Sequence, residues 1–165
     1  MPSVLFVCTA NMCRSPLAEV LFRDLLRRNG LQGDWRVHSA GVGVVHGQPA
    51  TEFSRQVAAD RGLDLSSHIS KPVDRASMQA ADLVLVMDSG HRQALREAYP
   101  QSADRVHLLS EMAGEGGPVE DPVGSTIEKY RLTADRITDL LTRGLDRIRD
   151  LAARPAAQEG HEPND

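Results

Sequence analysis

Short apolar segments alternate with helix-forming segments along most of this chain, and this alternation limits the possible folds more than any other feature. The apolar segments are continuous or rich in β-branched residues, as is typical of strands buried on both faces of a sheet. We expect strands at residues 4–7, 35–38, 82–87 and 105–109. Strands that alternate with helices indicate a parallel sheet with helices on both faces. The sequence therefore predicts an α/β fold with a four-stranded parallel sheet.

The predicted helices begin and end at local sequence signals. We expect helices from Ser15-Pro16 to Gly30, from about Thr51 to Arg61, from Ser89 to just before Pro100, and from Ser125 to about Ala152. Ser89 is expected to cap the third helix. Ser125 and Glu128 have the spacing of a capping box, in which each side chain bonds a free amide at the start of a helix. These signals separate the strands as an alternating fold requires.

Length and composition fit one globular domain. The 165 residues carry a formal charge of −4, which argues against a nucleic-acid partner. No apolar run approaches the ~18 residues of a membrane span. The chain lacks a basic segment before its first apolar run, so we expect a strand there and not a signal peptide. We expect a single domain over residues 1–153 and a disordered tail over residues 154–165, which has two prolines and no apolar period.

The chain has only two cysteines, Cys8 and Cys13, five residues apart. Two thiols this close are poor staples for a whole domain, which favours a reducing, cytoplasmic location and points to local chemistry. Both lie in the loop after the first predicted strand. Ligands of parallel α/β sheets bind beyond the carboxyl ends of the strands, so this loop is the first candidate site.

The loop from Cys8 to Ser15 has the pattern Cys-x5-Arg-Ser, and each part of it suits a phosphate dianion. A compact loop that ends at a helix N-terminus directs backbone N–H groups and the helix dipole at an anion. Arg14 can present a planar fork to two phosphate oxygens. This environment favours the nucleophilic thiolate. We predict that Cys8 is a nucleophile, instead of a buried strand-end cysteine, and that the phosphate site consists of Thr9, Ala10, Asn11, Met12, Cys13, Arg14 and Ser15.

Asn11 and Ser15 have two compatible interpretations. Asn11 suits a loop and tolerates a left-handed backbone, which would allow it to brace the loop. Ser15 suits a helix N-cap, and its hydroxyl can also donate a hydrogen bond to the sulfur of Cys8. We expect both residues to support the phosphate site.

The segment from Val7 to Glu19, with Ala10 where glycine is usual, is similar to the N-terminal signature of the low-molecular-weight protein tyrosine phosphatases. Further matches follow in the family's order: Ser39-Ala40-Gly41, His68, Leu85-Val86-Met87-Asp88 and Glu120-Asp121-Pro122. They span roughly residues 4 to 150. The resemblance includes a bacterial branch that also contains protein-arginine phosphatases.

The resemblance implies that Asp121 is the general acid and base, although an Asp-Pro pair alone is typical of a turn. Cys8 would attack phosphorus while Asp121 protonates the leaving oxygen, and the Asp121 carboxylate would then activate water to release phosphate. Arg14 and the loop amides would stabilise the equatorial oxygens. No metal or cofactor is expected, because the six histidines show no ligand spacing.

Supporting residues also follow from the resemblance. Ser39 and His68 would brace the loop through Asn11, although His68 could equally be an exposed loop histidine. Asp88 would lie near the pocket rim or cap a helix. For Cys13, the resemblance implies a reversible disulfide with Cys8 that protects against overoxidation, and the alternative is a small buried residue at a helix start.

The substrate is less determined. Tyrosine-directed members of the family place aromatic residues after Ser-Ala-Gly and after Asp-Pro, where this chain has valines. Residues 121–130 resemble the branch with arginine phosphatases, but that branch has threonine at the place of the apolar Met12. We predict phosphotyrosine, with phosphoarginine as the alternative. The predicted pocket wall consists of Met12, Val45, His46, Asp88 and Val123.

Two other classes are disfavoured. Arsenate reductases on this scaffold use two further cysteines, and this chain has none beyond Cys13. A non-enzymatic binding domain would not need Cys8, Arg14 and Asp121 together. The expected partner is a phosphorylated protein, with a tyrosine kinase as the candidate counterpart, and the expected state is a monomer or weak homodimer.

Overall fold

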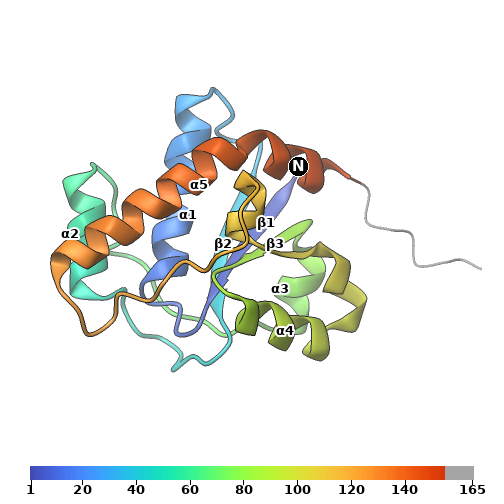
Figure 1. Cartoon of the computed structure of the whole chain (residues 1–165), viewed down its shortest axis with the longest axis horizontal. Coiled ribbons are helices and arrows are strands. Elements are labelled where there is room, and N and C mark those ends of the chain that lie inside the picture. The colour runs from blue at the N-terminus through green and yellow to red at the C-terminus, as the bar shows by residue number, and fades with distance from the viewer. Residues whose placement is uncertain (155–165) are drawn as a thin grey trace, which may run out of the picture.

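Four parallel strands form one sheet in the order β2-β1-β3-β4 (Figure 1). The computed structural model describes residues 1–154, so the predicted tail, apart from Arg154, lies outside the described residues. The strands are β1 (Ser3–Cys8), β2 (Arg36–Gly41), β3 (Leu83–Val86) and β4 (Val106–Leu108). The helices are α1 (Arg14–Arg28), α2 (Glu52–Asp60), α3 (Arg75–Ala80), α4 (Ser89–Ala98) and α5 (Ile127–Ala153), with short 3-10 helices η1 (Pro100–Arg105) and η2 (Leu109–Ala113). The predicted α/β fold is confirmed.

Strand β1 is buried on both faces, because alternate residues of a strand point to opposite sides of the sheet. Val4 and Phe6 belong to the core beneath α1 and α5, whereas Leu5 and Val7 belong to the core beneath α3 and α4. Figure 1 shows these two pairs of helices on opposite sides of the strands. The continuous apolar run in the sequence thus reflects a central strand covered on both faces.

Two predicted helix caps are wrong by one residue. Asp88, not Ser89, caps α4 by accepting a hydrogen bond from the backbone N of His91 at 2.9 Å. Thr126, not Ser125, caps α5, and no capping box forms there because the Ser125 hydroxyl donates to the carbonyl of Pro122 instead. In both cases a neighbour with a suitable side chain takes the cap, which sequence spacing alone does not resolve.

Three short elements were not predicted. Helix α3 has only six residues and only Met78 is buried, so the sequence carries no apolar period there. The 3-10 helix η1 follows α4, and η2 begins at Leu109, where we expected the last residue of a strand. None of these elements changes the sheet.

The strand order reverses between the neighbouring strands β1 and β3: β2 lies on one side of β1, whereas β3 and β4 lie on the other. Their carboxyl ends, at Cys8 and Val86, therefore meet at one edge of the sheet. The backbone N of Val119 donates to the carbonyl of Met87 at 2.8 Å, which brings the segment before Asp121 to the same edge. Such a switch point is where open α/β sheets bind ligands. Among the described residues, no helix is both long and apolar enough to cross a membrane.

Candidate active site

Cys8 is the last residue of β1, and its side chain faces the start of α1. Its Sγ lies 2.9 Å from the Ser15 Oγ, and the residue is only 3% exposed. The N-cap of α1 is Cys13, which makes no side-chain capping bond, so the interpretation of Ser15 as an N-cap is wrong: Ser15 lies within the first turn, and its hydroxyl is next to the Cys8 sulfur instead. The N–H groups of the first turn are therefore not occupied by a capping side chain, as an anion site at a helix N-terminus requires.

Asn11 shapes the loop between Cys8 and α1. It is the only non-glycine residue with a left-handed backbone among residues 1–154, with a φ of 56°. Its Nδ2 donates to the hydroxyls of Ser15 at 2.8 Å and Ser39 at 3.0 Å, and its Oδ1 accepts from the backbone N of Lys71 at 3.0 Å. Its carbonyl lies 2.7 Å from the Nε2 of His68. One side chain thus joins the loop to α1, β2 and the segment before α3, and the structure brings Ser39 and His68 to it.

Gly41 at the end of β2 allows the loop to pass close to the sheet. A Cβ at this position would lie 2.5 Å from the carbonyl oxygen of Thr9 and 2.9 Å from the backbone N of Asn11. The following residue, Val42, donates its N–H to the carbonyl of Cys8 at 3.0 Å. The Ser39-Ala40-Gly41 segment therefore supports the loop with a side chain and with a close backbone approach.

Arg14 is buried, with a side chain only 5% exposed, yet it carries the central charge of the site. Its Nη1 donates to the carbonyl of Val119 at 3.0 Å, and its Nη2 donates to the Thr9 hydroxyl at 3.4 Å. The Asp88 Oδ2 lies 3.7 Å from Nη1, and the Asp121 Oδ2 lies 3.6 Å from Nη2. The structure therefore brings Arg14 together with both predicted aspartates.

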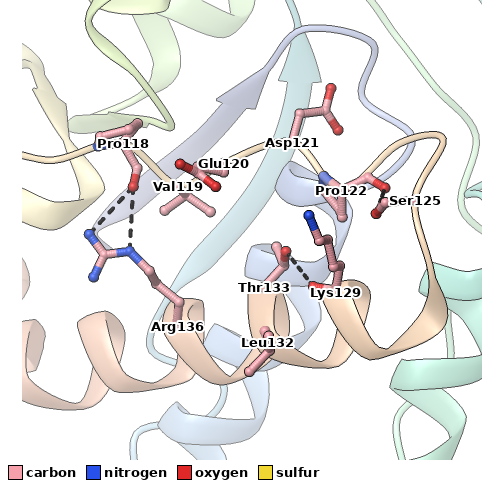
Figure 2. Close-up of a pocket in the computed structure, with 10 residues that line it drawn as sticks. All are labelled: Pro118, Val119, Glu120, Asp121, Pro122, Ser125, Lys129, Leu132, Thr133 and Arg136. Carbon is pink, nitrogen blue, oxygen red and sulfur yellow. Dashed lines mark hydrogen bonds between the residues drawn. The ribbon is translucent and has the colours of Figure 1, made fainter.

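Asp121 reaches the site from an exposed loop. Its Oδ1 accepts the backbone N–H of Val123 at 3.0 Å, which orients the carboxylate. Figure 2 shows the carboxylate pointing away from Lys129 and Leu132, which line a cavity of about 470 Å³ between this loop and α5. Asp121 thus borders this cavity but directs its charge toward Arg14.

The predicted pocket-wall residues are not all in one place. Met12 is partly buried, and its carbonyl accepts from the backbone N of Thr51 at 2.8 Å. Val45 and Val123 are 70% and 58% exposed, so both are open to contact with a substrate. His46 lines a separate cavity beside the edge strand β2.

Cys13 lies in the loop beside Cys8, and both cysteines are free. Burial raises the pKa of the Cys13 thiol to about 12, and a hydrogen bond with the Ser54 side chain partly offsets that effect. Cys13 is therefore a neutral thiol at neutral pH.

Sequence reasoning missed His91. This residue of α4 is 5% exposed, and its Nε2 lies 2.8 Å from the Thr9 Oγ1. Burial lowers the pKa of His91 below that of an ordinary histidine. Its position three residues after Asp88, in the first turn of a helix that starts at the carboxyl edge of the sheet, was the signal that could have identified it.

No cluster of three or more potential metal-ligating side chains occurs within residues 1–154.

A sequence profile described as low molecular weight phosphotyrosine protein phosphatase matches residues 3–153. The chain belongs to this family.

Individual members of the family resemble the chain over most of its length. A protein-arginine-phosphatase of Bacillus subtilis is 37% identical over 139 residues, which cover 84% of this chain and 91% of that protein. The crystal structure of a low-molecular-weight protein tyrosine phosphatase from T. tengcongensis matches with a TM-score of 0.84 and 37% identity, over 89% of this chain and 99% of that one. A structure of the YwlE arginine phosphatase, with its active-site cysteine changed to a phosphorylated serine, matches with a TM-score of 0.82 and 36% identity, over 88% of this chain and 93% of that one.

We predict that Asn11→Ala destabilises the fold more than Ser39→Ala does. Alanine at a left-handed position is strained and leaves the Lys71 N–H without an acceptor, so we expect a loss of about 2–4 kcal/mol. Ser39→Ala removes one acceptor of Asn11, with an expected loss of about 1 kcal/mol. Urea unfolding of both variants measures the difference. Equal losses would contradict the bracing function of Asn11.

Proposed function

We propose that this phosphatase hydrolyses phosphotyrosine in proteins through a phosphorylated Cys8. The observation that carries the proposal is the convergence of three groups at one edge of the sheet. These are the Cys8 sulfur at the end of β1, which is hydrogen-bonded to Ser15, the buried guanidinium of Arg14, and the Asp121 carboxylate 3.6 Å from that guanidinium. A nucleophile, an oxyanion partner and a proton donor are what cleavage of a phosphate monoester requires.

The first step forms a sulfur–phosphorus bond. The Cys8 thiolate attacks phosphorus, the bond from phosphorus to the tyrosyl oxygen breaks, and that oxygen takes a proton from Asp121. Arg14 and the loop amides bind the three equatorial oxygens, where charge is concentrated in the transition state. The Ser15 hydroxyl, 2.9 Å from the sulfur, stabilises the thiolate before attack.

The second step returns the enzyme to its starting state. The Asp121 carboxylate removes a proton from water, and the resulting oxygen attacks the phosphorus of phosphorylated Cys8. The sulfur–phosphorus bond breaks, and the electron pair returns to the sulfur, where Ser15 again donates a hydrogen bond. The relative whose active-site serine carries phosphate supports a covalent intermediate at this place in the family.

Phosphoarginine is the second candidate substrate, and the Bacillus subtilis relative named protein-arginine-phosphatase favours it. Met12 favours phosphotyrosine instead, because its partly buried thioether can contact an aromatic ring. The exposed Val45 and Val123 offer further apolar surface to such a ring.

The proposal also covers the enzyme's location, its counterpart kinase and its oligomeric state. The enzyme would act in the cytoplasm, where its two thiols stay reduced, and it would reverse the action of a tyrosine kinase. It would function as a monomer or a weak homodimer.

We predict that Cys8→Ser reduces hydrolysis of p-nitrophenyl phosphate to near background. Asp121→Ala should lower kcat by about 10²–10⁴-fold, with the greatest loss for poor leaving groups, because these depend most on a donated proton. Steady-state kinetics over a series of aryl phosphates measures both effects. Glu120→Ala, which changes the exposed neighbouring carboxylate, is the matched control and should retain activity. A Cys8→Ser variant with substantial turnover would contradict the proposal.

Substrate choice gives a second prediction. We expect wild-type enzyme to release phosphate faster from phosphotyrosine than from phosphoarginine in matched peptides. Met12→Thr should shift this ratio toward phosphoarginine, because it replaces an apolar contact with a hydroxyl, whereas Met12→Leu should preserve the ratio. A clear wild-type preference for phosphoarginine would overturn the choice of phosphotyrosine.

We further propose that Cys13 protects Cys8 from irreversible oxidation by forming a disulfide with it. Hydrogen peroxide would oxidise the Cys8 thiolate to a sulfenic acid, and the Cys13 thiol would then displace water to form a disulfide that external thiol reduces. After peroxide and then thiol, wild-type enzyme should recover more activity than Cys13→Ser. Bound inorganic phosphate should protect both forms equally. Equal recovery without phosphate would exclude a protective disulfide.

A further inference from the structure

We propose that His91 is a positioning residue that acts through Thr9 to hold Arg14 in its phosphate-binding orientation. The inference rests on the proposed function, because it concerns the same loop. His91 touches no reacting atom in this account. It connects α4, on one face of the sheet, to the loop that follows the central strand.

Three side chains, those of Thr9, His91 and Asp88, form a closed ring of contacts with the Arg14 guanidinium. The Arg14 Nη2 donates to the Thr9 Oγ1 at 3.4 Å, and the Thr9 Oγ1 lies 2.8 Å from the His91 Nε2. The His91 Nδ1 lies 3.4 Å from the Asp88 Oδ1, and the Asp88 Oδ2 lies 3.7 Å from the Arg14 Nη1. Arg14 is therefore held from both of its terminal nitrogens by groups that themselves contact His91.

The Asp88 carboxylate decides the direction of these hydrogen bonds. Its Oδ1 lies 3.4 Å from the His91 Nδ1 and favours a proton on that nitrogen. In a neutral ring Nε2 is then unprotonated and accepts the hydrogen of the Thr9 hydroxyl, while the Thr9 oxygen accepts from Arg14, which can only donate. Within residues 1–154, this Nδ1 is one of two buried side-chain polar atoms without a hydrogen-bond partner.

The charges around His91 come from three elements. Asp88 at the start of α4 and Asp121 from the loop before α5 favour a protonated ring, whereas Arg14 from α1 disfavours it. Burial outweighs these effects and lowers the pKa of His91, consistent with a neutral ring in the working enzyme. A protonated ring would donate to the Thr9 oxygen, which would then accept from two cationic groups, so the contact with Arg14 would weaken.

Three variants test this inference. His91→Ala removes the acceptor of the Thr9 hydroxyl and should lower kcat/KM for p-nitrophenyl phosphate by about tenfold, with a parallel loss of vanadate affinity. His91→Gln keeps an acceptor near the position of Nε2 and should restore most of that loss. His107→Gln is the matched control, because burial also lowers the pKa of His107, but this residue lies on β4 and belongs to no contact of the ring. It should behave as wild type.

A pH profile separates positioning from a merely structural contribution. The ratio of wild-type kcat/KM to that of His91→Gln cancels the ionisation of the substrate and of Cys8, because both enzymes share them. This ratio should fall only at acidic pH, below the range in which an ordinary histidine titrates, because burial lowers the pKa of His91 and only the wild-type ring gains a proton there. The same ratio for His107→Gln should stay constant.

The outcomes are decisive in both directions. Wild-type kinetics and vanadate affinity in His91→Ala, or a pH-independent ratio for His91→Gln, would overturn the inference. If His91→Ala does not fold, the His91→Gln ratio decides alone. An inactive Cys8→Ser variant together with an unaffected His91→Ala would reject the positioning residue and leave the proposed function intact, whereas an active Cys8→Ser variant would reject the function itself.

Discussion

The side chain of Asn11 holds the site together. A left-handed residue within a phosphate-binding loop is strained unless its surroundings compensate, and here three side-chain hydrogen bonds and the contact between its carbonyl and His68 do so. The same bonds position the Ser15 hydroxyl, which in turn lies next to the sulfur of Cys8. The position of the Cys8 sulfur, the proposed nucleophile, therefore depends on a residue that need not touch the substrate. Gly41 adds to this support, because only a residue without a Cβ lets the loop lie so close to β2.

The charged groups beside the loop are also arranged around one residue, Arg14. Arg14 is buried between the carboxylates of Asp88 and Asp121, so its charge is balanced before any phosphate arrives. Asp121 is the more exposed of the two, which suits its proposed exchange of protons with a leaving group and with water. The reversal of strand order between β1 and β3 brings these groups together from segments more than a hundred residues apart in the chain.

Local patterns in the sequence were sufficient to predict the sheet and the position of the loop. The apolar run of β1 and the Cys-x5-Arg spacing are both local, so their structures follow from neighbouring residues. The contact between Thr9 and His91 could not be predicted this way, because it joins residues 82 positions apart. Helix α3 was missed since six residues with one buried side chain leave no period to detect. The cap of α5 was misassigned because Ser125 bonds Pro122, a competition that depends on the shape of the preceding turn.

The central claim is that phosphate is carried on the sulfur of Cys8, and trapping it is the most direct test. Asp121→Ala enzyme mixed with p-nitrophenyl phosphate and quenched in acid should accumulate the intermediate, because nitrophenolate leaves as an anion without a donated proton, while attack by water needs the missing base. Phosphorus NMR of the quenched protein should show one thiophosphate signal, and peptide mapping should place it on Cys8. A phosphoryl group on any other residue would contradict the account.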